Sequence, residues 1–249
     1  MRPTICLGLL LFFCNSAEAQ WITEKKDYSS PKNFAFELKL GPYSPNIDSE
    51  FITGKGPYET IFGESTGLMF QAEFDYQIWN GFGNIGLGLS AGFFNVSANA
   101  CKDDGSDTTP SSCIDKTQGE TSIMLFPFSL LAVYRFDVLA TKWDIPFVPF
   151  GKIGPNYTLW WTQNTSENIK QNDSANIVGG TFGWQVNAGV SLLLDVFEPD
   201  SAKALDNDLG INHTYLFFEF AYVKADGFGS KTALHVGDIT WQAGLAFEF

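Results

Sequence analysis

The stretch that decides the fold is residues 237–249, Gly-Asp-Ile-Thr-Trp-Gln-Ala-Gly-Leu-Ala-Phe-Glu-Phe. Apolar side chains stand at every second position from Ile239 to Phe249, and the positions between them are small or polar. This period of two predicts a β-strand with one apolar and one polar face. In a transmembrane β-barrel the apolar face meets lipid and the other face meets a polar interior. The stretch therefore predicts one strand of such a barrel.

Earlier segments show the same alternation and predict the partners of this strand. They span residues 33–43, 67–79, 85–96, 121–136, 146–161, 180–197 and 212–224. In the fifth of these segments Lys152 decides the phase, because a lysine on the lipid face near mid-membrane costs roughly 2–4 kcal/mol. We therefore place Lys152 inside. Pro127 lacks an amide donor and predicts a bulge in the fourth segment.

The connections between these segments alternate in length. Long polar stretches (44–66, 97–120, 162–179 and 225–236) alternate with shorter ones (80–84 and 137–145). Outer-membrane barrels combine long external loops with short periplasmic turns, so both chain ends are predicted on the periplasmic side. The connection 198–211 is long for a turn, and its first half predicts a short helix with Pro199 near its start.

The predicted fold class is therefore all-β: an eight-stranded antiparallel transmembrane β-barrel with a short helical segment in the last periplasmic connection. The alternative is a soluble β-sandwich or lipocalin-like barrel, in which the apolar faces would share one buried core. The long segments carry more apolar surface than such a core would hold.

The first residues predict export. Arg2 precedes an apolar run from Ile5 to Cys14, and residues 17–19, Ala-Glu-Ala, resemble a cleavage site. The run is shorter than the roughly 20 residues of a membrane-spanning helix. We therefore predict a cleaved signal peptide at 1–19, an outer-membrane β-barrel domain at 20–249, and a location in the bacterial outer membrane.

Two cysteines, Cys101 and Cys113, lie in one polar connection. In an oxidising compartment they predict a disulfide, whereas a metal pair would need nearby histidine or further cysteine ligands. The acidic run 103–107 lacks the spacing of a calcium loop. No metal or cofactor is predicted. A net charge of −13 argues against nucleic acid as a partner.

The inward-facing positions carry ionisable side chains of both signs. The predicted interior polar network consists of Glu37, Lys39, Glu73, Asp75, Arg135, Lys152, Asp195, Glu219 and Glu248. The interior of an eight-stranded barrel is just wide enough for side chains to fill, and buried charges must pair. The pattern therefore predicts a plugged lumen. A narrow pore or ligand cavity is the alternative, because Gly86, Gly88 and Gly92 would leave local room.

Aromatic residues gather near both ends of the predicted strands, as expected at membrane interfaces. A sugar-binding platform is the alternative for Trp160 and Trp161 at the outer ends. His213 and His235 are the two histidines of the chain. Neither lies at a recognisable catalytic spacing, so no catalytic residue and no enzymatic activity are predicted.

With these features the chain resembles the small outer-membrane β-barrel proteins of Gram-negative bacteria, in the size class of OmpA, OmpX and OmpW. The runs Leu130–Asp137, Pro146–Lys152 and Gly210–Tyr215 resemble an uncharacterised family of myxobacterial barrels. The final strand resembles the signature that the barrel-assembly machinery reads. The resemblance makes Trp241, Leu245, Phe247 and Phe249 the predicted assembly signal.

The partners that the resemblance implies are outer-membrane lipid, lipopolysaccharide and the assembly machinery, and it leaves any surface ligand unspecified. We predict a structural or surface-interaction role. The alternatives are a narrow, porin-like channel for small or hydrophobic solutes and a lipid-modifying enzyme of the outer membrane.

Overall fold

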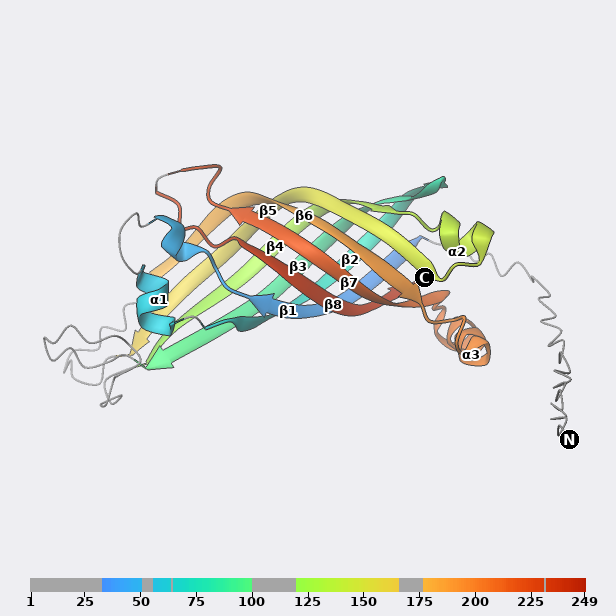
Figure 1. Cartoon of the computed structure of the whole chain (residues 1–249), viewed down its shortest axis with the longest axis horizontal. Coiled ribbons are helices and arrows are strands. Elements are labelled where there is room, and N and C mark those ends of the chain that lie inside the picture. Colours follow the sequence, from blue (N-terminus) through green and yellow to red (C-terminus); the bar gives the residue numbers. More distant parts are fainter. Residues whose placement is uncertain (1–32, 51–55, 64, 100–119, 166–176, 231) are drawn as a thin grey trace, which may run out of the picture.

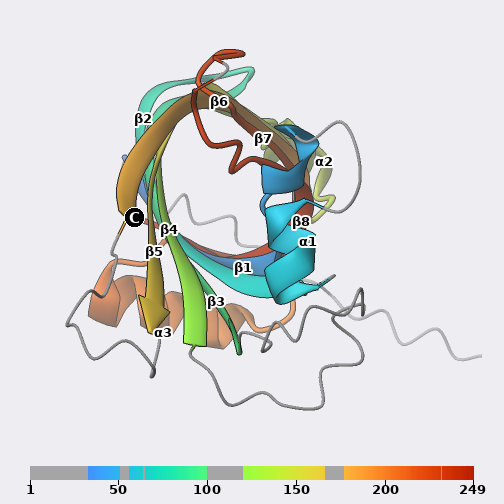
Figure 2. The ribbon, with the colours of Figure 1, turned by 90° about the vertical axis from the view of Figure 1, so that its left-hand side faces the viewer.

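Eight antiparallel strands close into a barrel, each pairing with its neighbours in sequence, and the last pairs with the first (Figures 1 and 2). The computed structural model describes residues 33–50, 56–63, 65–99, 120–165, 177–230 and 232–249. The strands are β1 (Phe34–Tyr43), β2 (Gly67–Gly81), β3 (Gly83–Asn99), β4 (Glu120–Arg135), β5 (Phe147–Thr165), β6 (Ile177–Leu193), β7 (His213–Ala225) and β8 (Asp238–Glu248). The predicted fold class is confirmed. The predicted signal peptide and the Cys101–Cys113 disulfide lie outside the described residues.

Short helices lie in the connections of the barrel. They are η1 (Ile47–Glu50) and α1 (Pro57–Phe62) between β1 and β2, α2 (Val138–Trp143) between β4 and β5, and α3 (Pro199–Leu209) between β6 and β7. The predicted helix near Pro199 is confirmed as α3, whereas η1, α1 and α2 were not predicted. Among the described residues, no helix is both long enough and apolar enough to cross a membrane.

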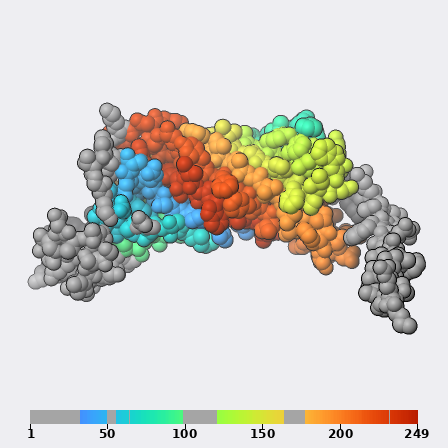
Figure 3. All heavy atoms as spheres, in the orientation of Figure 1, coloured from blue at the N-terminus to red at the C-terminus, as the bar shows by residue number. Residues whose placement is uncertain are grey.

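The two ends of the barrel differ. We call the end where β1 begins and β8 ends the inner end, and the opposite end the outer end. At the inner end the backbone closes the wall: Asn33 N donates to Phe249 O at 2.9 Å, and Phe249 N donates to Phe34 O at 2.8 Å. At the outer end, the η1 segment (blue) lies beside the β7–β8 connection (red) in the space-filling view (Figure 3). The amide of Asn46 joins these two segments by donating to Gly237 O at 2.9 Å.

The outward face of the wall is apolar from strand to strand. Leu89 and Phe220 are each 62% exposed, although both are large hydrophobic residues. Others of this set are Leu38, Phe70, Phe74, Leu87, Leu130, Ile153, Phe182, Leu216, Trp241 and Leu245. A continuous apolar surface of this kind on a closed barrel is the surface of a membrane-spanning protein, because lipid would cover it and water would not.

The predicted bulge at Pro127 is wrong. Ala91 pairs with Phe128 and Phe94 pairs with Leu125, so the β3–β4 register is the same on both sides of the proline. The ladder omits a pairing there and gains no residue. The register shift on β2 lies between Gln77 and Trp79, near the inner end.

Candidate functional site in the barrel interior

A belt of paired charges crosses the middle of the lumen. The alternation of β1 and β2 turns Glu37 and Glu73 inward, and the register sets them directly opposite each other. Two opposed carboxylates repel, so the pairing needs a cation between them. Lys152 supplies it from β5, with its Nζ 2.5 Å from Glu37 and 2.7 Å from Glu73.

Two further cations complete the belt. Lys39 Nζ lies 2.7 Å from Glu73 and 2.8 Å from Glu219 on β7. Arg135, at the end of β4, donates to Glu37 at 2.5 Å and also to Asp75. Each of the three cations therefore joins carboxylates from different strands, and the belt ties β1, β2, β4, β5 and β7 together across the lumen.

The belt is almost fully removed from solvent. The lysine and glutamate side chains are at most 3% exposed, and Arg135 is 13% exposed. The ammonium of Lys152 also lies 5.1 Å from the ring centre of Phe150, within range of a cation–π interaction. Removing one partner of a buried pair leaves an uncompensated charge, which costs about 3–5 kcal/mol. This geometry makes the belt a rigid part of the barrel.

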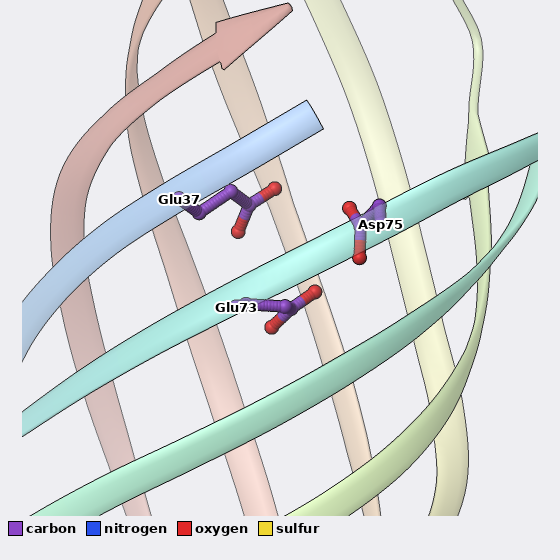
Figure 4. Close-up of side chains that lie close together, drawn as sticks. All are labelled: Glu37, Glu73 and Asp75. Carbon is purple, nitrogen blue, oxygen red and sulfur yellow. The ribbon is translucent and has the colours of Figure 1, made fainter. Parts of the chain in front are cut away.

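Glu37, Glu73 and Asp75 point toward one another from β1 and β2 (Figure 4). Their carboxylate oxygens lie within 4.8 Å of one another, a spacing that could hold a metal ion. Each of the three carboxylates, however, already contacts a lysine or arginine of the chain. Lysine and arginine side chains therefore already neutralise these carboxylates.

A chain of uncharged polar groups continues the belt toward the outer end. Asn187 Nδ2 donates to Glu219 at 2.9 Å, and Gln185 Nε2 donates to Asn187 at 2.9 Å. The chain continues through Ser129, Asn156 and Thr158, each within 2.9 Å of the next polar partner. The predicted network contained only ionisable residues and left out all five of these polar residues. Their inward positions on β4, β5 and β6 were the available signal.

The glycines of β3 leave no open cavity beside the belt, contrary to the alternative raised from the sequence. A Cβ at Gly88 would lie 2.3 Å from Asp75 Oδ1, and a Cβ at Gly92 would lie 2.8 Å from Gln71 Cγ. A Cβ at Gly86 would meet the backbone of Tyr76 at 2.8 Å. Neighbouring atoms therefore already fill the room that the missing side chains leave.

An apolar plug closes the lumen above the belt, at the outer end. Ile47 of η1 and Tyr58 and Phe62 of α1 fold into the mouth and pack on inward side chains of the wall. The wall contributes Tyr43, Met69, Phe94, Ile123, Leu125, Val223 and Ala225, and Val236 joins from the β7–β8 connection. Sequence reasoning read residues 44–66 as a polar loop and missed this plug. The available signals were Pro57, which suits the first turn of a helix, and the apolar residues that follow it.

A smaller group closes the inner end. Phe150, Phe217 and Ala246 pack together, and Tyr215 lies against them. Here Glu248 accepts from Gln77 Nε2 at 2.7 Å and from the Tyr215 hydroxyl at 3.2 Å. Glu248 thus lies inside the barrel, in a group separate from the belt contacts of Glu37 and Glu73.

Asp195 makes its contacts at the inner end, beyond the last residue of β6, Leu193. Asp195 lies in the following turn, where its Oδ2 is 2.6 Å from His213 Nδ1 and its Oδ1 accepts from Thr214 N at 3.1 Å. It ties the turn to the start of β7.

At the outer rim, a pocket of about 780 Å³ lies between the β1–β2 and β7–β8 connections. Asp48, Glu59, Asp226 and Asp238 are among its lining residues. Ser49 also lines it, with its Oγ 3.0 Å from His235 Nδ1, a contact that the sequence spacing did not suggest.

Trp160 lies on the inner face of the wall and not in the outward aromatic girdle. Its ring packs against the apolar plug, and its Nε1 donates to Thr181 Oγ1 at 3.3 Å. The two adjacent tryptophans therefore face opposite sides of the strand, which removes the predicted alternative of a shared sugar platform. Of the predicted assembly signal, Trp241 and Leu245 on β8 and Phe249 just after it are exposed. The fourth residue, Phe247, is half-buried.

The sequence matches no protein-family model and no curated protein. Solved structures are similar. The outer membrane protein OprG from Pseudomonas aeruginosa is 15% identical over 88% of this chain and 96% of its own, with a TM-score of 0.49. Neisserial surface protein A is 14% identical over 87% of this chain and 97% of its own, with a TM-score of 0.44. A major outer membrane protein from Thermus thermophilus is 11% identical over 87% of this chain and 99% of its own, with a TM-score of 0.44.

Proposed function

We propose that this chain is an integral protein of the bacterial outer membrane with a closed lumen, acting as a structural or surface-interaction protein. The observation that carries the proposal is the filling of the barrel: an apolar plug above a belt of buried ion pairs. A solute crossing the lumen would have to displace the plug and separate cations that each bridge carboxylates on different strands. Functional contacts would then fall to the outer connections and their rim pocket.

Single-channel recording in planar bilayers tests this proposal. With insertion verified by recovery of folded protein from the bilayer lipid, we expect no conductance steps above background, because the plug and the belt obstruct the lumen. An open porin in the same lipid serves as the positive control. Steady, reproducible openings would reject the closed lumen and favour the narrow-channel alternative.

A lipid-modifying enzyme is the second candidate, and the observation in its favour is the contact between Ser49 Oγ and His235 Nδ1 in the rim pocket. A nucleophilic site pairs such a hydroxyl with a histidine base. In this structure, however, the Ser49 hydroxyl also donates to Asn46 O at 2.8 Å, a bond that holds η1 together. Mass spectra of lipid A from cells with and without the protein separate the two roles, and Ser49→Ala is the matched control.

A further inference from the structure

The helix α3 lies across the barrel axis, outside the wall, at the inner end. Figure 1 views the helix nearly along its own axis, whereas Figure 2, turned by 90°, shows it lengthwise beside the barrel wall. If the barrel axis runs along the membrane normal, α3 lies parallel to the membrane plane. It lies beside the wall and does not cover the opening.

The described part of the protein covers this helix only in part: Ala202, Leu205 and Asp206 are half-buried, and the other residues of α3 are exposed. None of its residues is buried, and its ends carry large exposed apolar side chains: Phe197 just before α3 is 66% exposed and Leu209 at its last position is 64% exposed. Val196 is 47% exposed. Large apolar side chains this exposed at the two ends of a helix indicate a surface that lipid or another molecule covers.

The lipid-facing surface of the wall leads directly to these side chains. Leu216 on β7 and Val190 on β6 belong to the outward apolar face near the inner end, and Val196 and Phe197 lie in the turn that follows β6. The α2 connection, also at the inner end, exposes Trp143 by 64%. The apolar band of the barrel thus extends onto the connections at this end.

We propose that α3 is an in-plane membrane anchor, with Phe197 and Leu209 inserted at the boundary between phospholipid headgroups and acyl chains of the inner leaflet. Interfacial helices of this kind insert their apolar side roughly 5–10 Å deep. The inference rests on the membrane-spanning barrel proposed above and assigns it a second, separate contact with lipid.

The charges of α3 indicate which phospholipid headgroups it would contact. The helix carries Asp200, Asp206 and Asp208 against Lys203. An acidic helix gains nothing from anionic headgroups, whereas basic segments bind to them. The partner is therefore a zwitterionic phospholipid, bound through apolar insertion. A soluble protein docking on the same side chains is the competing occupant.

Site-directed spin labelling distinguishes these occupants. The full chain, with its four cysteines replaced by serine, is refolded into phosphatidylcholine vesicles after introducing Phe197→Cys, Leu209→Cys or Asn207→Cys. Asn207 is the matched control, because two positions along an α-helix face nearly opposite sides. For each label we measure the ratio of its collision rate with oxygen, which partitions into lipid, to its collision rate with a water-soluble nickel chelate. This ratio is expected to be several-fold higher at 197 and 209 than at 207.

A label at Phe220→Cys reports on the wall itself. If 220 is shielded from the nickel chelate while 197 and 209 are as accessible to it as 207, the anchor is rejected and the membrane barrel stands. If the label at 220 is also accessible to the nickel chelate, the proposed embedding of the barrel in the membrane is rejected, and the anchor proposal that rests on it is rejected with it. A preference of 197 and 209 for oxygen that appears only after adding anionic phospholipid would also overturn the proposal.

Discussion

Single residues in the interior show how closely the lumen is packed. At Gly88, the carboxylate of Asp75 occupies the space that a side chain would take. Asp75 in turn accepts from Arg135, which also holds Glu37. A glycine, a carboxylate and a guanidinium on three strands therefore depend on one another, and small changes at any of them should be measurable.

The substitution Gly88→Ala should destabilise the barrel by about 1–3 kcal/mol, the usual cost of overpacking a filled interior. The added Cβ would lie 2.3 Å from Asp75 Oδ1. Gly151→Ala is the matched control, since the nearest atom to its Cβ would be Asn187 O at 3.8 Å. Urea unfolding from vesicles measures both. Equal stability of the two variants would contradict the packing described for Gly88.

Removing the guanidinium by Arg135→Ala should lower the free energy of unfolding by about 3–5 kcal/mol, because Glu37 and Asp75 would lose a shared buried partner. Lys203→Ala, which removes an exposed contact 3.9 Å from Asp200 on α3, should leave the unfolding midpoint unchanged. Thermal melts of the refolded protein compare the two. An unchanged melting temperature for Arg135→Ala would reject the belt as a stabilising plug.

At the scale of elements, the connection between β1 and β2 acts as part of the interior. Asp48 accepts from the amides of Tyr58 and Glu59 at 2.8 and 2.7 Å, which holds α1 over the mouth. The Tyr58 hydroxyl donates to Ser65 O at 3.0 Å. These local bonds hold Tyr58 and Phe62 in the apolar plug. The mostly polar connection between β1 and β2 therefore contributes two of the plug's aromatic side chains.

The plug should loosen at alkaline pH. Burial, together with Asp238 and Asp48, raises the pKa of Tyr58 from 10.0 to about 12. Docking of α1 is therefore fully favoured below pH 10 and loses this contribution as the pH rises through 12, because only the undocked tyrosine ionises readily between these values. Limited proteolysis of residues 44–66 across this range should show faster cleavage in the wild type than in Tyr58→Phe. Identical pH profiles would count against the docked phenol.

At the scale of the whole molecule, β8 closes the barrel on β1, with Leu38 paired to Leu245 and Ala35 to Glu248. The backbone of Phe249 joins this seam through its bonds to residues 33 and 34, whereas its side chain is 36% exposed on the outward face. The two parts of one residue can therefore be separated experimentally.

The substitution Phe249→Ser keeps the backbone bonds of the seam and removes the outward ring. We expect folding in detergent to be retained and assembly into the outer membrane of cells to fall several-fold, because the ring is part of the predicted assembly signal. Heat-modifiable mobility on gels measures folding, and fractionated membranes measure assembly. Normal surface levels of the variant would reject the signal role.

The barrel could be predicted from sequence because a strand has a period of two, so each residue type reports which face it occupies. The prediction that Lys152 points inward, which fixed the faces of its segment, is confirmed because Lys152 is buried in the structure. Nothing in the sequence indicated that Asp195 would contact His213, because these two residues lie 18 positions apart in the chain. Trp160 was placed with Trp161 because proximity in sequence hides the alternation.

The sequence by itself determined the strands, their faces, the closure in chain order and the ionisable residues available to the interior. Only the tertiary structure decided which charges meet, because pairing across the lumen depends on the register and tilt of strands that are distant in sequence. It also decided that residues 47, 58 and 62 enter the mouth, since a connection folds inward only where the wall offers an apolar surface. For the same reason the direction of α3, across the barrel axis and beside the wall, emerged only from the folded barrel.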